Sequence, residues 1–159
     1  MSIREVKAFF AARGMEDRVL EFDTSSATVE LAAQTVGVIP ARIAKTLSFM
    51  TPDGPLLVVT AGDAKIDNHK FKETFGCKAK MLTPEEAVEL IGHAVGGVCP
   101  FAVKAGVKTC LDHSLRRFST VFPACGSSNS AVELTCEELY AFSGALAWVD
   151  VCKGWQENE

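Results

Sequence analysis

The sequence predicts an α+β protein in which helices pack around a mixed, largely antiparallel sheet or partial barrel. The segment "TLSFMTPDGPLLVVTA", residues 46–61, places a strong turn between two β-rich runs and therefore indicates an antiparallel hairpin. Strand-like and helical segments intermingle along the chain without a strict β-α-β alternation. Hydrophobic residues make up 48% of the composition, which is enough to form a buried core.

The expected elements of the first half follow from helix signals and from β-rich runs. Ser2–Glu5 has the capping-box pattern, and glycines at 14, 37 and 76 provide stop signals for three helices. We therefore expect a helix from 2 to about 14, a strand at 19–22, a helix ending at 37, a helical turn from 40, the hairpin 46–61, and a helix over 67–76.

The second half gives shorter and more scattered signals. Capping-box patterns at 83–86 and 135–138 each predict a helix, the first of them running to about Ile91. A glycine-rich segment occupies 92–101. The expected strands are 78–82, 109–111, 118–122, 131–134 and 145–152.

The overall composition limits the classes of function. The 159 residues show no linker or repeat, so we expect a single domain over 1–159. The formal net charge of −4 argues against a non-specific polyanion binder, and we expect no DNA partner. The N-terminal segment lacks a secretory apolar core, and the longest apolar runs are too short to cross a bilayer. We expect a cytoplasmic protein with no membrane partner.

Cysteine and histidine usage predicts neither disulfides nor a metal site. The chain has six cysteines but no C-x-x-C, and most lie beside apolar residues, so reduced thiols are expected. Three scattered histidines do not suggest zinc, although His93 and Cys99 flank the glycine-rich segment and could share an ion. No phosphate-binding or dinucleotide-binding glycine motif occurs, and no cofactor is expected.

Two features carry the candidate chemistry. Lys45 follows a predicted helical turn and has apolar neighbours, so it suits either phosphate binding or an ordinary surface position. It belongs to a locally basic stretch, 42–80. The loop "GGVCPF", 96–101, has almost no titratable side chain, so either it is a turn or its backbone is the functional surface. A third possibility makes Cys99 a nucleophile with His93 as its base.

The order and spacing of short motifs resemble the YbaK/EbsC family. The matching segments are "RIAKTLSF", "LLVVTAGDAKID", "KF", "GGVCPF", "LD" and "SNSAVEL". The resemblance extends from about 24 to 151. This family includes the editing domain of bacterial prolyl-tRNA synthetases and free-standing aminoacyl-tRNA deacylases.

The resemblance implies a set of site residues. The family's lysine falls on Lys45, and its G-x-x-x-P loop falls on Gly96, Gly97, Val98, Cys99 and Pro100. The implied substrate-binding residues are Thr24, Thr28, Leu47, Gly62, Asp63, Pro100, Ser128 and Ser130. Some relatives carry an acidic residue in the region of Ser128 and Ser130. Glu133 and Asp150 match it only loosely, and we assign no role to either.

The resemblance further implies hydrolysis, acting in trans, of the ester that joins a wrongly attached small amino acid to tRNA. Ala, Cys, Ser and Thr are the expected amino acids, and proline is excluded by size. Backbone amides of Gly96, Gly97 and Val98 would stabilise the oxyanion, while Lys45 would hold the terminal phosphate. The implied partners are aminoacyl-tRNA and a prolyl-tRNA synthetase or elongation factor. A non-catalytic tRNA-binding or regulatory module and a Cys99-dependent esterase or thioesterase are the alternatives.

Overall fold

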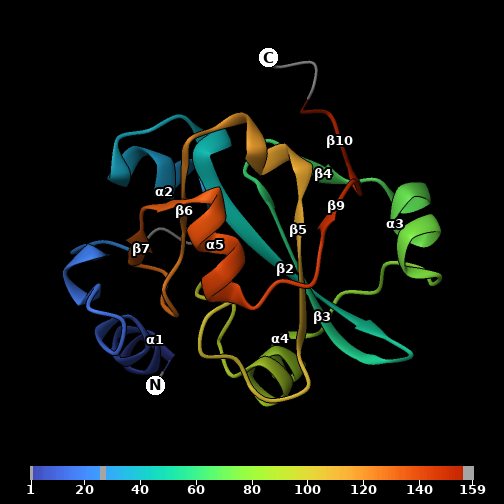
Figure 1. The fold of residues 1–159 in the computed structure, drawn as a ribbon, viewed down its shortest axis with the longest axis horizontal. Coiled ribbons are helices and arrows are strands. Elements are labelled where there is room, and N and C mark those ends of the chain that lie inside the picture. Colours follow the sequence, from blue (N-terminus) through green and yellow to red (C-terminus); the bar gives the residue numbers. More distant parts are fainter. Residues whose placement is uncertain (1, 26–27, 156–159) are drawn as a thin grey trace.

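A six-stranded mixed sheet with strand order β8-β6-β2-β3-β5-β9 forms the centre of the protein (Figure 1). The computed structural model describes residues 2–25 and 28–155. The strands of this sheet are β2 (Ile43–Thr51), β3 (Gly54–Ala61), β5 (Lys108–Asp112), β6 (Thr120–Pro123), β8 (Leu134–Thr135) and β9 (Trp148–Val149). The longest pairing, β2 with β3, is antiparallel, whereas β6, β5 and β9 join by parallel pairings. The predicted mixed α/β fold with a partial barrel is confirmed.

Two short antiparallel ribbons complete the curled sheet. They consist of β1 (Val19–Glu21) with β7 (Ser130–Val132), and of β4 (Lys65–Ile66) with β10 (Cys152–Lys153). In Figure 1, β1 and β7 lie on the same side of the molecule as α1 and α2, and the β4–β10 ribbon lies at the upper end of the sheet. Each ribbon therefore brings together chain segments that are far apart in sequence.

The predicted hairpin is confirmed, and its first strand begins at Ile43, earlier than expected. At its turn, the Thr51 hydroxyl donates to the Gly54 carbonyl at 2.8 Å and accepts from the Asp53 N–H at 3.1 Å. A single helical turn, η2 (Pro40–Arg42), precedes β2, as the Pro40 signal predicted. Lys45 is consequently the third residue of a central strand.

The helices surround the sheet (Figure 1). They are α1 (Ser2–Ala11), α2 (Val29–Val36), α3 (Asn68–Phe75), α4 (Pro84–Glu86) and α5 (Cys136–Ser143). Thr28 caps α2, Asp67 caps α3, and complete capping boxes begin α4 and α5. The side chain of Ser2, in the first predicted capping box, is outside the described part of the chain. Short turns η1 (Glu16–Arg18) and η4 (His113–Arg117) were not predicted.

Four predicted elements differ from the structure. The strand predicted over 131–134 divides into β7, which pairs with β1, and β8, which pairs with β6. Segment 78–82 forms one bridge, Met81 with Phe49, because the chain turns away at once into the cap of α4. The helix predicted to run to Ile91 changes after Glu86 into a π-helical turn, η3 (Ala87–Ile91), which Gly92 closes. The strand predicted over 145–152 divides into β9 and β10, because the Val151 N–H bonds to the Asp112 side chain at 2.9 Å instead of a strand.

The core lies between the sheet and the helices. Phe10 of α1 meets Phe101 edge to face, and Phe49 of β2 packs on Phe71 of α3. All four rings are at most 2% exposed. Within the described ranges, no helix combines the length and apolar character that crossing a membrane requires.

Candidate active-site cavity

A cavity of about 270 Å³ opens beside β2, where that strand lacks a neighbour on one side. The parallel pairing with β6 ends at Ala44, and the next backbone bond on this edge joins the Ser48 carbonyl to the Leu82 N–H. Thr46 lies between Ala44 and Ser48. Residues two apart in a strand direct their backbone N–H and C=O groups to the same edge, and those of Ser48 face away from β3. The N–H and C=O of Thr46 therefore face the cavity.

The cavity has an apolar wall and a hydroxyl-bearing wall. The apolar wall comes from α2, β2 and β6 and consists of Val29, Ala32, Val36, Ile43 and Phe122. Opposite it lie the glycine-rich loop, the loop between β6 and β7, and the first residue of β7, which contribute Val95, Gly96, Val98, Ser127, Ser128 and Ser130. Such a mixture of apolar surface and few polar groups is typical of small-molecule sites.

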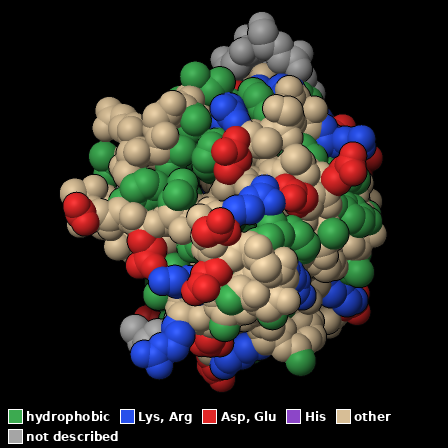
Figure 2. Space-filling model, turned by 60° about the vertical axis from the view of Figure 1, so that its left-hand side comes forward, with side chains coloured by type: hydrophobic (Ala, Val, Ile, Leu, Met, Phe, Trp, Pro, Cys, Tyr) green, Lys and Arg blue, Asp and Glu red, His purple; other side chains and the backbone are tan. Residues whose placement is uncertain are grey.

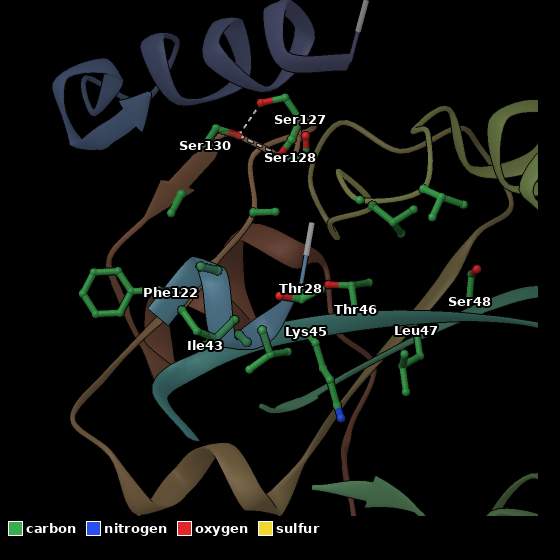
Figure 3. Close-up of a pocket in the computed structure, with 18 of the residues that line it drawn as sticks. Thr28, Ile43, Lys45, Thr46, Leu47, Ser48, Phe122, Ser127, Ser128 and Ser130 are labelled. Atoms are coloured by element: carbon green, nitrogen blue, oxygen red, sulfur yellow. Dashed lines mark hydrogen bonds between the residues drawn. The ribbon is translucent and has the colours of Figure 1, made fainter. Parts of the chain in front are cut away.

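Thr46 presents the cavity's most conspicuous polar group. Its Oγ1 is buried and has no hydrogen-bond partner in the described part of the chain. In Figure 3, Thr46 and Ser48 point to one side of β2, whereas Lys45 and Leu47 point to the other. An unpaired buried hydroxyl costs about 1–3 kcal/mol, so its persistence at a cavity wall is typical of a group that binds a ligand.

Lys45 lines the cavity and extends toward the end of β3 and the β4–β10 ribbon. Burial lowers the pKa of its ammonium, while Cys152, Asp63 and Glu30 act in the opposite direction. No ion pair within 4.0 Å involves Lys45 among the residues that the structure describes. A partly desolvated cation without a carboxylate partner suits an anionic ligand.

The glycine-rich loop contains two glycines that the geometry requires. Gly96 has φ +93°, in the left-handed region that favours glycine. A β-carbon on Gly97 would lie 2.6 Å from the Gly126 carbonyl carbon and the Ser127 nitrogen, so the two loops pack backbone against backbone. The Gly97 N–H donates to the Ala94 carbonyl at 3.0 Å. The other two amides expected at the oxyanion, those of Gly96 and Val98, donate no hydrogen bond to a backbone carbonyl within the described ranges.

Hydrogen bonds fix the serine-containing loop. The Ser130 hydroxyl accepts from the Cys125 N–H at 3.2 Å and lies 2.8 Å from the Ser127 hydroxyl. Ser128 and Ser25 join their hydroxyls at 2.7 Å, which links this loop to the segment before α2. Ser128 and Ser130, two of the predicted substrate-binding residues, thus belong to one preorganised wall.

Thr28 and Leu47 also line the cavity, whereas four other predicted substrate-binding residues lie outside its lining. Gly62 allows β3 to approach the Pro40 carbonyl, which a β-carbon would strike. Asp63 accepts two bonds from Arg117, at 3.0 and 2.6 Å, in an ion pair whose side chains are 16% and 13% exposed. Pro100 is buried behind the loop, and Thr24 is exposed. These four residues have structural or peripheral positions.

Cys99 and His93 meet but are poorly placed for covalent chemistry. The Cys99 Sγ lies 3.6 Å from His93 Nε2, and the two residues are 0% and 1% exposed. Burial raises the pKa of the Cys99 thiol to about 12 and lowers the pKa of His93. Neither residue lines the cavity. No group of three or more His, Cys, Asp or Glu side chains suited to a metal occurs in the described ranges.

Sequence reasoning missed Thr46, Ser48 and the apolar wall from α2. The alternation of β2 could have indicated that Thr46 and Ser48 share a face. The open edge beside Thr46 had no sequence signal, because it depends on where β6 ends its pairing.

Comparisons with known proteins converge on one family. Residues 23–142 match the model of the aminoacyl-tRNA editing domain. The uncharacterized protein YwhH of Bacillus subtilis (strain 168) is 55% identical over 157 residues, which cover 98% of this chain and 100% of YwhH. A proline–tRNA ligase of Halalkalibacterium halodurans is 34% identical over 110 residues, covering 68% of this chain but 19% of the ligase.

Solved structures agree with this result. The crystal structure of a proposed trans-editing enzyme for prolyl tRNA synthetase superposes with a TM-score of 0.87 and 32% identity, covering 96% of this chain and 98% of the other. The crystal structure of the hypothetical protein APE2540 gives a TM-score of 0.83 and 31% identity, covering 94% and 99%. The likeness thus includes nearly the whole fold.

Proposed function

Because the chain belongs to the aminoacyl-tRNA editing domain family, we propose that it is a trans-acting deacylase of mischarged tRNA. The observation that carries this proposal is the combination found at one cavity. An open strand edge with the unpaired Thr46 hydroxyl, two available loop amides and the unpaired Lys45 ammonium surround about 270 Å³. This arrangement suits an esterified amino acid attached to a phosphate-bearing nucleotide.

In this mechanism, a water oxygen attacks the ester carbonyl and the bond to the ribose oxygen breaks. The terminal ribose's free hydroxyl acts as the base by accepting a proton from the water and passing its own proton to the ribose oxygen that leaves the ester. The amides of Gly96 and Val98 donate to the oxyanion, a contribution of about 3–4 kcal/mol for one preorganised donor. Lys45 holds the terminal phosphate and takes no proton. Positioning and charge stabilisation are sufficient because the ester is already activated.

The small cavity favours small amino acids. We propose Ala, Cys, Ser or Thr as the removed residue, since apolar side chains and hydroxyls both line the walls. Discrimination by size is the usual basis of editing. Aminoacyl-tRNA is the proposed partner, and a prolyl-tRNA synthetase or elongation factor is proposed to deliver it.

The experiment incubates the purified protein with Ala-, Cys-, Ser-, Thr- and Pro-tRNA and follows loss of the labelled amino acid. Lys45→Ala is compared with Lys108→Ala, which removes an exposed lysine at the opposite end of the sheet. Rapid loss of one or two small amino acids, abolished in Lys45→Ala alone, supports the proposal. Binding of tRNA without hydrolysis of any ester contradicts it and favours a non-catalytic binding module.

A further inference from the structure

The β4–β10 ribbon carries an unusual pair of like charges. Lys65 and Lys153 are direct cross-strand partners, and both are exposed. Like charges placed directly opposite each other destabilise a strand pair. This ribbon has only one other register pair, Ile66 with Cys152, so little in the ladder offsets the repulsion.

Neighbouring cations at this end of the sheet already have carboxylate partners. Lys70 pairs with Asp150 at 3.1 Å, and Arg117 pairs with Asp63. Lys65 and Lys153 have no ion pair within 4.0 Å in the described part of the chain. The Asp67 Oδ1 accepts from the Lys70 and His69 backbone amides of α3, which lower the pKa of that carboxyl, and nearby Lys153 adds a smaller effect in the same direction.

Lys45 joins this ribbon to the cavity. It lines the cavity, and its side chain points to the side of β2 opposite Thr46 and Ser48. Cys152 and Lys65 of the ribbon are among the groups that act on its ammonium. A chain-like anion whose end occupies the cavity and passes Lys45 therefore reaches the ribbon next.

We propose that Lys65 and Lys153 bind the phosphates that precede the terminal nucleotide of a single-stranded RNA 3′ end. This inference rests on the proposed function, because it assumes that the 3′-terminal ester occupies the cavity. Acidic and basic side chains intermingle over the α1/α2 side of the molecule shown in Figure 2, so that face offers no continuous basic track. With a formal net charge of −4, affinity for RNA depends on a few placed cations.

The test measures the dissociation constant of a labelled single-stranded RNA ending in CCA as a function of salt. We compare the wild type with Lys65→Ala/Lys153→Ala, with the charge-conserving Lys65→Arg/Lys153→Arg, and with Lys78→Ala/Lys108→Ala. The last removes two exposed lysines of the 76–80 segment and the start of β5. Thermal unfolding verifies that each variant is folded.

We expect the first variant to bind about tenfold more weakly, with a salt slope reduced by about 1.4, since each single-strand phosphate contact contributes about 0.7. The arginine variant should retain affinity, and the Lys78/Lys108 variant should match the wild type. The proposal is overturned if RNA binding weakens equally in both alanine variants, or if it does not weaken in Lys65→Ala/Lys153→Ala. Because no ester is hydrolysed, this outcome is distinct from a failure of the deacylase activity.

Discussion

Gly97 and Ser127 lie so close together that a β-carbon on Gly97 would stand 2.6 Å from the Ser127 nitrogen. The glycine-rich loop and the serine-containing loop are therefore positioned by direct backbone contact. This contact fixes the position of the loop that carries Gly96 and Val98, which line the cavity. Gly97 thus acts through packing, and its own N–H is engaged with Ala94.

Replacing Gly97 with valine should separate the two loops and move both amides. We expect kcat/KM for the aminoacyl ester to fall about 100-fold, the typical loss when one oxyanion donor is removed. Gly106→Ala is the control, because the space around Gly106 is open and its φ of +89° introduces backbone strain alone. Full activity in Gly97→Val would show that the loop contact does not position the donors.

Thr46→Val tests the unpaired hydroxyl. Valine has nearly the same shape and removes a buried polar atom without a partner, so the free energy of unfolding should rise by about 1 kcal/mol. The KM for the aminoacyl ester should rise at the same time if the hydroxyl binds substrate. Chemical denaturation and steady-state kinetics measure the two effects.

Thr60→Val is a matched control for this substitution. Thr60 is 0% exposed, and its hydroxyl donates to the Ala61 carbonyl at 3.2 Å, so its removal should lower stability. A destabilised Thr46→Val protein with unchanged KM would indicate that the Thr46 hydroxyl has a structural role.

Local signals predicted the elements that depend on neighbouring residues. The turn at 52–55 and the capping boxes at Thr83 and Thr135 occur as expected. The strand predicted over 78–82 and the single strand predicted over 145–152 were wrong, because the structure of both segments depends on distant partners such as Asp112. Local propensity carries no information about which edge of a sheet stays open.

The site shows the same division. Sequence motifs selected Lys45 and the 96–100 loop as candidates, and Lys45, Gly96 and Val98 line one cavity. The same motifs include Gly62 and Asp63, whose contacts with Pro40 and Arg117 maintain the scaffold. A motif alone does not distinguish a residue that binds substrate from one that holds a strand in place.

Cys99→Ala should retain activity. Its thiol is fully buried and has a pKa of about 12, so almost no thiolate exists at neutral pH. We expect kcat/KM to change by less than about threefold, with a loss of stability from the deleted core atom. Iodoacetamide, which reaches the partly exposed Cys77 and Cys136 before the buried thiols, should also leave activity intact. Inactivation that follows alkylation of Cys99 would support the esterase alternative.

The charged Lys45 side chain should destabilise the folded protein at neutral pH, because burial disfavours its charged form and lowers its pKa. In the window between this lowered pKa and the ordinary lysine value near 10.4, the unfolded chain binds a proton that the folded chain lacks. The free energy of unfolding therefore rises with pH across that window. Lys45→Met removes the charge, so it should raise Tm at pH 7.

The difference in Tm between Lys45→Met and the wild type should shrink as the pH approaches 10. Lys108→Met provides the comparison, since Lys108 is exposed and its replacement should give no such pH-dependent difference. Measuring Tm by circular dichroism across this range, together with ester hydrolysis, separates the two roles of Lys45. A lower Tm in Lys45→Met at pH 7 would mean that the ammonium stabilises the free protein, and hydrolysis would then have to be compared at equal folded fraction.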